Sequence, residues 1–217
     1  MRILGIIPAR GGSKAIPKKN IHPLNGKPLI KYTIDEALKS NLYDLVLTTD
    51  DQEIASYYYK VITRPSHLAA DDTPMLPVIQ HTLEVYPETV DAVMLLQPTS
   101  PLRITEDIDK AIQKFTEYDM YYPDCDSLIS VCEGIHPIKC YDEAGTPFLD
   151  QEPYDKHKHK CLVRNGAIFI AKVELIKQGR LIGDRPLLFE MPKGRSFDID
   201  NYSDLIIVEA LLKGGVH

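Results

Sequence analysis

The sequence lacks any apolar run long enough to cross a membrane, which takes ~20 residues. The apolar start MRILGIIPA is too short and too soon interrupted for a signal sequence. The 217 residues are 44% hydrophobic and 26% charged, which is typical of a soluble globular protein. We therefore expect a cytoplasmic protein that does not associate with membranes, folded as one domain over residues 1–217.

Cysteine pairs and an excess of basic residues are also missing. Cys125, Cys132, Cys140 and Cys161 form no C-x-x-C pair, so we expect free thiols in a reducing compartment, not disulfides or a zinc site. The formal net charge of −6 argues against nucleic acid as a partner, because proteins that bind the phosphate backbone usually carry a basic excess. No internal repeat or low-complexity segment is visible.

Short apolar runs alternate with segments of helical spacing along most of the chain. We predict strands at residues 2–8, 44–49, 61–63, 92–96, 127–132, 165–171 and 187–191, and helices at 28–40, 52–60, 75–86, 105–115 (capped by Thr105), 173–178 and 203–212. This alternation predicts an α/β fold with a doubly wound, mostly parallel sheet. Residues 133–163 show little apolar periodicity, and we interpret them as an excursion from the sheet.

The loop after the first predicted strand contains two glycines and a cluster of cations, in the segment IIPARGGSKAIPKKN at residues 6–20. Open α/β sheets bind ligands at the carboxyl ends of their strands. Gly11 and Gly12 can take positive φ and bring backbone N–H groups close to a phosphate. Cationic donors are added by Arg10, Lys14, Lys18 and Lys19. The segment matches neither the P-loop nor the dinucleotide fingerprint, and a solvated connection is the alternative to a polyphosphate site.

Two aspartates near the end of the sequence form the second candidate element. In the segment SFDID, Asp198 and Asp200 are two residues apart, so in an extended chain they project to one side. Such a pair suits Mg²⁺, which is often held by one or two carboxylates plus waters and phosphate oxygens. From spacing alone, a pair that caps the helix beginning near Tyr202 fits equally well.

A third element, QPTSPLR at residues 97–103, follows the strand at 92–96. The Gln97 amide offers both a donor and an acceptor, which suits the edge of a base or a sugar hydroxyl. A rigid packing turn is the alternative. That alternative fits Pro98 and Pro101 better than Gln97 and Arg103.

Taken together, these motifs resemble those of the acylneuraminate-type cytidylyltransferases, which make CMP-activated sialic acids and related nine-carbon acids. The segments RGGSK and PKKN match the family signature, and LQPTSPLR, NGAI and DID follow in the family's order. The resemblance spans residues 6–204. It implies a Rossmann-like nucleotidyltransferase domain, CTP and a sugar acid as substrates, and a homodimer in which residues 133–163 form an arm that reaches the partner's site.

The resemblance also implies roles for individual residues. Catalytic roles fall to Lys19, Arg10, Asp198 and Asp200, with Mg²⁺ held by the two aspartates. Nucleotide binding falls to Arg10, Gly11, Gly12, Ser13, Lys14, Asn20, Arg64 and Gln97. Sugar binding falls to Gln97, Lys139, Arg164 and Asn165.

The sequence departs from the family pattern at two places. Met75 follows D-T-P where relatives carry Ser or Thr, and DKHKHK at residues 155–160 replaces an R-Q-x-L-P run. The nucleotide side therefore matches the family more closely than the acceptor side. The strip at residues 157–160 suits an anionic acceptor or a solvated edge, since its lysines would repel a metal.

Two alternative functions stay open. One is a cytidylyltransferase for another acid, such as an eight-carbon sugar acid or a phosphonate. The other is a non-catalytic regulator that binds a nucleotide. The intact aspartate pair favours an enzyme, because a protein that only binds a nucleotide has less need of a metal at the reacting phosphate.

Overall fold

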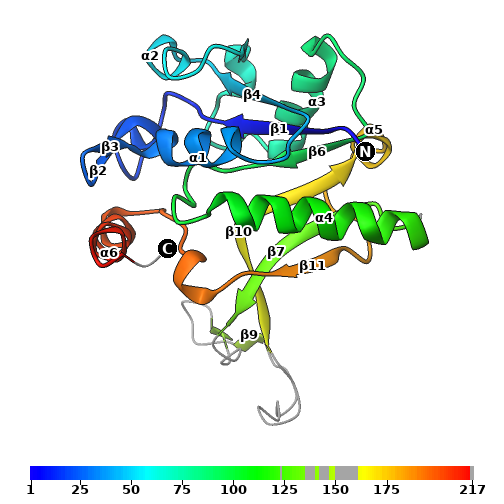
Figure 1. The fold of residues 1–217 in the computed structure, drawn as a ribbon. Coiled ribbons are helices and arrows are strands. Elements are labelled where there is room, and N and C mark those ends of the chain that lie inside the picture. Colours follow the sequence, from blue (N-terminus) through cyan, green and yellow to red (C-terminus); the bar gives the residue numbers. More distant parts are fainter. Residues whose placement is uncertain (123, 135–139, 142–146, 150–160, 216–217) are drawn as a thin grey trace.

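A seven-stranded sheet forms the centre of the molecule (Figure 1). The computed structural model describes residues 1–122, 124–134, 140–141, 147–149 and 161–215. In sheet order the strands are β11 (Leu187–Glu190), β7 (Ser127–Glu133), β10 (Leu162–Lys172), β6 (Ala92–Leu95), β1 (Ile3–Pro8), β4 (Asp44–Thr49) and β5 (Val61–Thr63). Only β10 runs antiparallel to its neighbours, β6 and β7, so the predicted mostly parallel α/β fold is confirmed.

Helices cover both faces of this sheet. They are α1 (Leu29–Leu38), α2 (Gln52–Ala55), α3 (Met75–Val85), α4 (Thr105–Tyr121) and α5 (Val173–Lys177), whereas α6 (Tyr202–Lys213) packs in a separate cluster. One core cluster joins the sheet to α1 and α4, and a second cluster joins the opposite face to α3 and α5. Each of these helices presents an apolar stripe to the sheet, as the helical spacing of their apolar residues requires.

A third apolar cluster lies outside the two faces of the sheet. It joins Ile16 of the first loop to Ile199 and to Leu205 and Val208 of α6. Ile16 and Ile199 are both fully buried. The cluster therefore packs the predicted phosphate loop against the segment that carries the two aspartates, although they lie at opposite ends of the sequence.

Short elements complete the described chain. Single 3-10 turns occur as η1 (Lys19–Ile21), η2 (Ser66–Leu68) and η3 (Lys193–Arg195), and β2 (Pro23–Leu24) pairs with β3 (Lys27–Pro28). Within the predicted arm, β8 (Cys140–Tyr141) pairs with β9 (Pro147–Leu149) in a sheet of their own. This pairing lies outside the seven-stranded sheet, as expected of an excursion.

Several local predictions need correction. The helix predicted over residues 52–60 ends at Ala55, because three tyrosines with modest helix propensity follow as the chain turns into β5. Thr105 is the first residue of α4, not its cap, and its side-chain hydroxyl donates to a Glu36 carboxylate oxygen at 2.7 Å. The α4 helix continues to Tyr121, and β10 begins three residues earlier than predicted.

Two further expectations, on membrane spans and on cysteines, can be compared with the described residues. No described helix combines the length and apolar character needed to span a membrane. Cys125, Cys132 and Cys161 are free thiols, as predicted.

Candidate active site

A cavity of 230 Å³ lies at the carboxyl ends of β1, β5 and β6. Six of the residues predicted to bind a nucleotide line it. They are Arg10, Gly12, Ser13, Asn20, Arg64 and Gln97, and Lys19 lines it with them. This is the sheet edge at which ligands bind in open α/β folds. The structure therefore brings the first loop and the strand end at Gln97 together in one cavity.

Two cations of the first loop, Arg10 and Lys14, are paired with a carboxylate that sequence reasoning missed. Asp71 forms ion pairs with Arg10 and with Lys14, the latter at 2.8 Å. The pair of cations lowers the pKa of Asp71, chiefly through the hydrogen bond from Lys14. Asp71 lies in the polar stretch after Arg64, and nothing in its local sequence distinguishes it from Asp72.

Gly11 is required by close packing, not by positive φ. Neither Gly11 nor Gly12 adopts positive φ, contrary to the prediction, and the left-handed conformation falls to Lys18 at φ 52°. A Cβ on Gly11 would lie 2.6 Å from an Asp51 carboxylate oxygen. The Gly11 N–H donates to Asp50 Oδ1 at 3.0 Å, which ties the loop to the end of β4.

Arg64 and Asn20 are buried beneath the loop. Arg64 donates to the Thr48 carbonyl at 3.0 Å, while its Nε atom has no hydrogen-bond partner among the described residues. Burial lowers the pKa of Arg64. Asn20 donates from Nδ2 to the Arg10 carbonyl at 2.9 Å, so it shapes the loop through this bond.

Lys19 connects the phosphate loop to the aspartate segment. Its Nζ donates to the Ile199 carbonyl at 2.9 Å and lies 3.9 Å from Asp200 Oδ1. The Lys19 side chain is 18% exposed and the Asp200 side chain is 80% exposed. The cationic loop and the acidic pair therefore meet at one place, with Lys19 between the cavity and the two carboxylates.

Asp198 is the more buried of the two aspartates. Burial is the largest cause that raises its pKa, and the nearby negative charge of Asp200 adds to it, while a hydrogen bond from Thr99 and the charge of Lys19 act in the opposite sense. Its Oδ1 atom is buried and has no hydrogen-bond partner among the described residues. A buried carboxylate oxygen without a partner is costly, and a bound cation would satisfy it.

The alternative role of the aspartate pair as a helix cap is excluded. Asn201 caps α6, with its Oδ1 accepting from the backbone N–H of Ser203 at 2.8 Å. Asp204 completes the cap by accepting from the Asn201 N–H at 2.9 Å. Asp198 and Asp200 thus keep their carboxylates for another purpose. Across the described residues no cluster of three or more His, Cys, Asp or Glu side chains forms, so a Mg²⁺ at the pair would need further ligands from water or substrate.

A second cavity of 530 Å³ adjoins the first and shares Met75 and Gln97 with it. Its polar lining comes from Arg164, Asn165, Ser196 and Asp198, and its apolar lining includes Leu95, Cys132, Val163, Phe169, Leu181 and Ile182. Gly166 lies in its wall at φ 74°, and a Cβ there would be 3.4 Å from Gln97 Oε1 and 3.5 Å from Asp198 Oδ2. The exposed Arg164 side chain lies over the Phe169 ring, 5.9 Å from its centroid.

Arg103 and Asn165, which the sequence singled out, use their polar side-chain atoms to bind other protein groups. Arg103 is 1% exposed and donates to the Ala167 carbonyl at 2.6 Å and to Thr33 Oγ1 at 2.8 Å. Burial lowers the pKa of Arg103 to about 10. Asn165 is 7% exposed, and its amide bonds with Ser130 and Ser196, which argues against contact between its side chain and a sugar.

Part of the predicted acceptor side lies outside the described residues. Outside the described residues lie Lys139, the strip at residues 157–160 and most of the arm at 133–163.

The structure is thus an α/β protein with a mostly parallel sheet, in which loop cations and an acidic pair lie on either side of Lys19. The chain belongs to the cytidylyltransferase family, whose sequence profile matches residues 4–202. It is therefore a member of a family of CTP-using enzymes.

Two curated relatives carry more specific names. The N-acylneuraminate cytidylyltransferase of Escherichia coli is 34% identical over 215 residues, which cover 94% of this chain and 50% of the relative. The chain thus spans half the length of that protein. The pseudaminic acid cytidylyltransferase of Campylobacter jejuni is 30% identical over an alignment of 230 residues, gaps included. The alignment covers 98% of this chain and 97% of the relative.

Solved structures share the fold at low sequence identity. A CMP:2-keto-3-deoxy-manno-octonic acid synthetase complexed with CTP superposes with a TM-score of 0.75 at 16% identity, over 99% of both chains. The 4-diphosphocytidyl-2C-methyl-D-erythritol synthase of Anaerococcus prevotii gives a TM-score of 0.66 at 13% identity, over 98% of both chains. At these identities the likeness concerns the fold alone.

Proposed function

We propose that the protein transfers the cytidylyl group of CTP to a sialic-acid-like nine-carbon sugar acid, giving the CMP-sugar and pyrophosphate. The observation that carries this proposal is the meeting of the phosphate loop and the aspartate segment at Lys19. The names of the E. coli and C. jejuni relatives support a nine-carbon acid as the acceptor.

The reaction needs positioning and charge neutralisation more than covalent help. The anomeric hydroxyl of the acid attacks the α-phosphorus, and the bond to the bridging oxygen of the pyrophosphate breaks. Arg10, Ser13 and Lys14, with the backbone N–H group of Gly12, hold the triphosphate, whereas the Gly11 N–H is occupied by Asp50. Lys19 offsets negative charge that develops on the α-phosphate or the leaving pyrophosphate.

The two aspartates fit a divalent cation. The buried, partnerless Oδ1 of Asp198 and the exposed carboxylate of Asp200 are hard oxygen donors of the kind Mg²⁺ prefers. When bound, Mg²⁺ supplies charge neutralisation at the reacting phosphate. The raised pKa of Asp198 matters for cation binding, because the carboxyl group must lose its proton before it can bind a cation.

We assign the nucleotide to the first cavity and the acceptor acid to the second. Arg64, Asn20 and Gln97 shape the nucleotide cavity. Arg164 and Lys139 meet the carboxylate of the acid, and Gln97 lies between the two ligands. We assign Asn165 to the support of this wall because its amide is occupied by protein partners.

Assembly as a cytoplasmic homodimer, with the arm at residues 133–163 reaching the partner's site, belongs to the same proposal. Light scattering at micromolar concentration checks this part, and a stable monomer would contradict it.

The function is tested by pyrophosphate release from CTP and Mg²⁺ with a panel of acids. The panel includes an N-acylated nine-carbon acid, a di-N-acylated nine-carbon acid, an eight-carbon sugar acid and a phosphonate. We expect release with a nine-carbon acid. Release confined to the eight-carbon acid or the phosphonate would assign a different acceptor, and tight CTP binding without any release would assign a nucleotide-binding regulator.

A further inference from the structure

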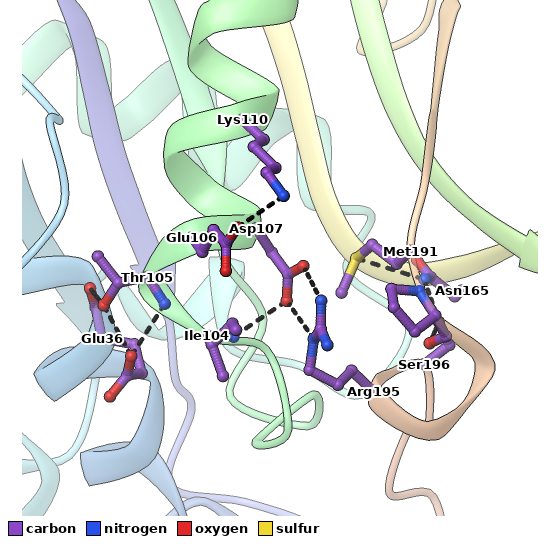
Figure 2. Close-up of polar contacts among 11 residues, drawn as sticks. Glu36, Ile104, Thr105, Glu106, Asp107, Lys110, Asn165, Met191, Arg195 and Ser196 are labelled. Atoms are coloured by element: carbon purple, nitrogen blue, oxygen red, sulfur yellow. Dashed lines mark hydrogen bonds and ion pairs between the residues drawn. The ribbon is translucent and has the colours of Figure 1, made fainter. Parts of the chain in front are cut away.

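The segment with the two aspartates is anchored on its upstream side by an ion pair between η3 and α4. Arg195, the last residue of η3, donates from Nε to Asp107 Oδ2 at 2.9 Å and from a terminal nitrogen to Asp107 Oδ1 at 2.7 Å (Figure 2). The Asp107 side chain is 3% exposed and that of Arg195 is 18% exposed. Asp107 Oδ2 also accepts from the Ile104 N–H at 3.1 Å, which fixes the carboxylate to the start of α4.

A second anchor follows immediately in the chain. Ser196 Oγ accepts from Asn165 Nδ2 at 2.8 Å and donates to the Pro192 carbonyl at 2.9 Å. Figure 2 shows Asn165 between Ser196 and Met191, on the side of the close-up away from Glu36. Asn165 is itself fixed by Ser130, whose hydroxyl donates to Asn165 Oδ1 at 2.6 Å. The chain is therefore tied to α4 three residues before Asp198, through Arg195, and to β10 two residues before it, through Ser196.

Downstream anchors complete the arrangement. The Ile199 N–H donates to the Thr99 carbonyl at 2.9 Å, and the Asp200 N–H donates to Asp204 Oδ2 at 2.9 Å. Asp198 thus lies between Ser196 and Ile199, both of which are held in place. On the upstream side, the anchor between Arg195 and Asp107 is an ion pair that joins residues 88 positions apart.

Stability is a weak reason for such a pair. Desolvation offsets much of the attraction in a buried ion pair, and apolar replacements of similar volume are often neutral. A bidentate contact between a guanidinium and a carboxylate does, however, fix two groups in distance and direction. Residues that hydrogen-bond to a metal ligand orient it without touching the metal, and Arg195 would act on Asp198 through the short backbone segment between them.

From these contacts we infer that Arg195 and Asp107 are positioning residues that set the direction of the Asp198 carboxylate for cation binding. The inference rests on the proposed function, because it needs a cation at Asp198 and Asp200. Neither residue touches substrate in this assignment. Their effect should therefore appear in the affinity for the cation and not in the affinity for CTP alone.

The test measures binding of Mn²⁺ in the presence of CTP by electron paramagnetic resonance, and binding of CTP without metal by calorimetry. We expect Arg195→Gln and Asp107→Asn each to weaken Mn²⁺ binding about tenfold, the usual size for residues that orient metal ligands. CTP binding without metal should stay within twofold. Arg195→Lys keeps the charge but not the bidentate fork, so it should restore only part of the loss.

Two controls separate the possible failures. Glu106→Gln removes a carboxylate one position away that pairs with Lys110 on the exposed side of α4 (Figure 2), and it should leave Mn²⁺ binding unchanged. Asp198→Asn should abolish Mn²⁺ binding. Loss in Asp198→Asn with wild-type affinity in Arg195→Gln and Asp107→Asn would overturn the inference and leave the proposed function standing.

Other outcomes are equally decisive. A wild-type protein that binds no Mn²⁺ with CTP would overturn both proposals. If Arg195→Gln does not fold, Arg195→Lys and Asp107→Asn carry the test, and a fall in melting temperature with unchanged Mn²⁺ affinity in both would show that the pair is structural only.

Discussion

The two adjoining cavities, which the proposed function assigns to the nucleotide and to the acceptor acid, are built in different ways. The first lies over parallel strands, is 230 Å³ in volume, and is lined by cations from loops at the strand ends. The second is 530 Å³, includes several apolar side chains, and takes Arg164 to Gly166 from β10, which runs antiparallel to both of its neighbours in the seven-stranded sheet. Under the proposed function, common phosphate chemistry explains the first cavity, whereas the second would be shaped by a particular acid.

Lys19 lines the first cavity and bonds to the segment that carries the two aspartates, so its removal should have the largest effect. Lys19→Ala removes the cation at the reacting phosphates and the hydrogen bond to the Ile199 carbonyl. We expect turnover in the pyrophosphate-release assay to fall by about 10²-fold or more, with near-normal circular dichroism. Lys110→Ala, which removes an exposed lysine of α4, is the matched control. Near-normal kcat in Lys19→Ala would remove the role assigned to Lys19.

Asp198→Asn should separate activity from stability. Because burial raises the pKa of Asp198, the folded protein holds the proton more tightly than the unfolded chain. Ionisation of Asp198 therefore destabilises the folded protein. This destabilisation is complete at pH values above the raised pKa and absent at pH values below the unfolded pKa of about 4. Without metal at pH 7, the variant should melt a few degrees higher than the wild type, and this gain should vanish at acidic pH.

The same substitution should nearly abolish metal-dependent turnover. Calorimetric melting at several pH values, paired with pyrophosphate release, checks both halves of this prediction. A lower melting temperature at pH 7 would show that Asp198 stabilises the fold instead of serving the site.

A reciprocal pair of substitutions tests whether the two cavities serve separate ligands. Arg10→Gln should raise the KM for CTP about tenfold, the usual effect of a lost charged hydrogen bond, and leave the KM for the acid nearly unchanged. Arg164→Gln should do the reverse. Steady-state kinetics with each substrate varied in turn measure both, and equal effects of Arg164→Gln on the two substrates would break the distinction between the cavities.

The smallest expected effect concerns Asp71. Its carboxylate holds Arg10 and Lys14, the cations proposed to hold the triphosphate, so CTP must compete with it. Asp71→Asn should lower the Kd for CTP about threefold at low salt, in line with the weakness of exposed ion pairs. The gain should shrink as ionic strength rises. Calorimetry at two salt concentrations measures it, and weaker CTP binding would show that Asp71 supports the loop.

Local patterns predicted the parallel half of the molecule well. The strands at 44–49 and 61–63 have the predicted bounds, because short β-branched runs between turn residues are clear local signals. The loop after β1 also lies where the rule for α/β sheets places it. The family resemblance added Arg64 and Asn20, whose place at the same cavity as Gln97 no local pattern showed.

The remainder depends on contacts between distant residues. Arg103 matches a motif, yet the structure buries it among carbonyls, and only the paths of α1 and β10 determine this. Asn165 is likewise held by Ser130 and Ser196, 35 and 31 residues away. Asp71 and Asp107 look like ordinary surface acids in the sequence, because their cationic partners come from other elements.

The bond between Lys19 and Ile199 joins positions 180 residues apart. During synthesis, β1 and its glycine-rich loop leave the ribosome long before residues 196–200 do. A nascent chain can therefore expose its anion-binding loop early, but it cannot complete the catalytic centre until nearly the whole domain has emerged and the Ile16–Ile199 packing has closed. Assembly of the complete site is thereby a late event of folding.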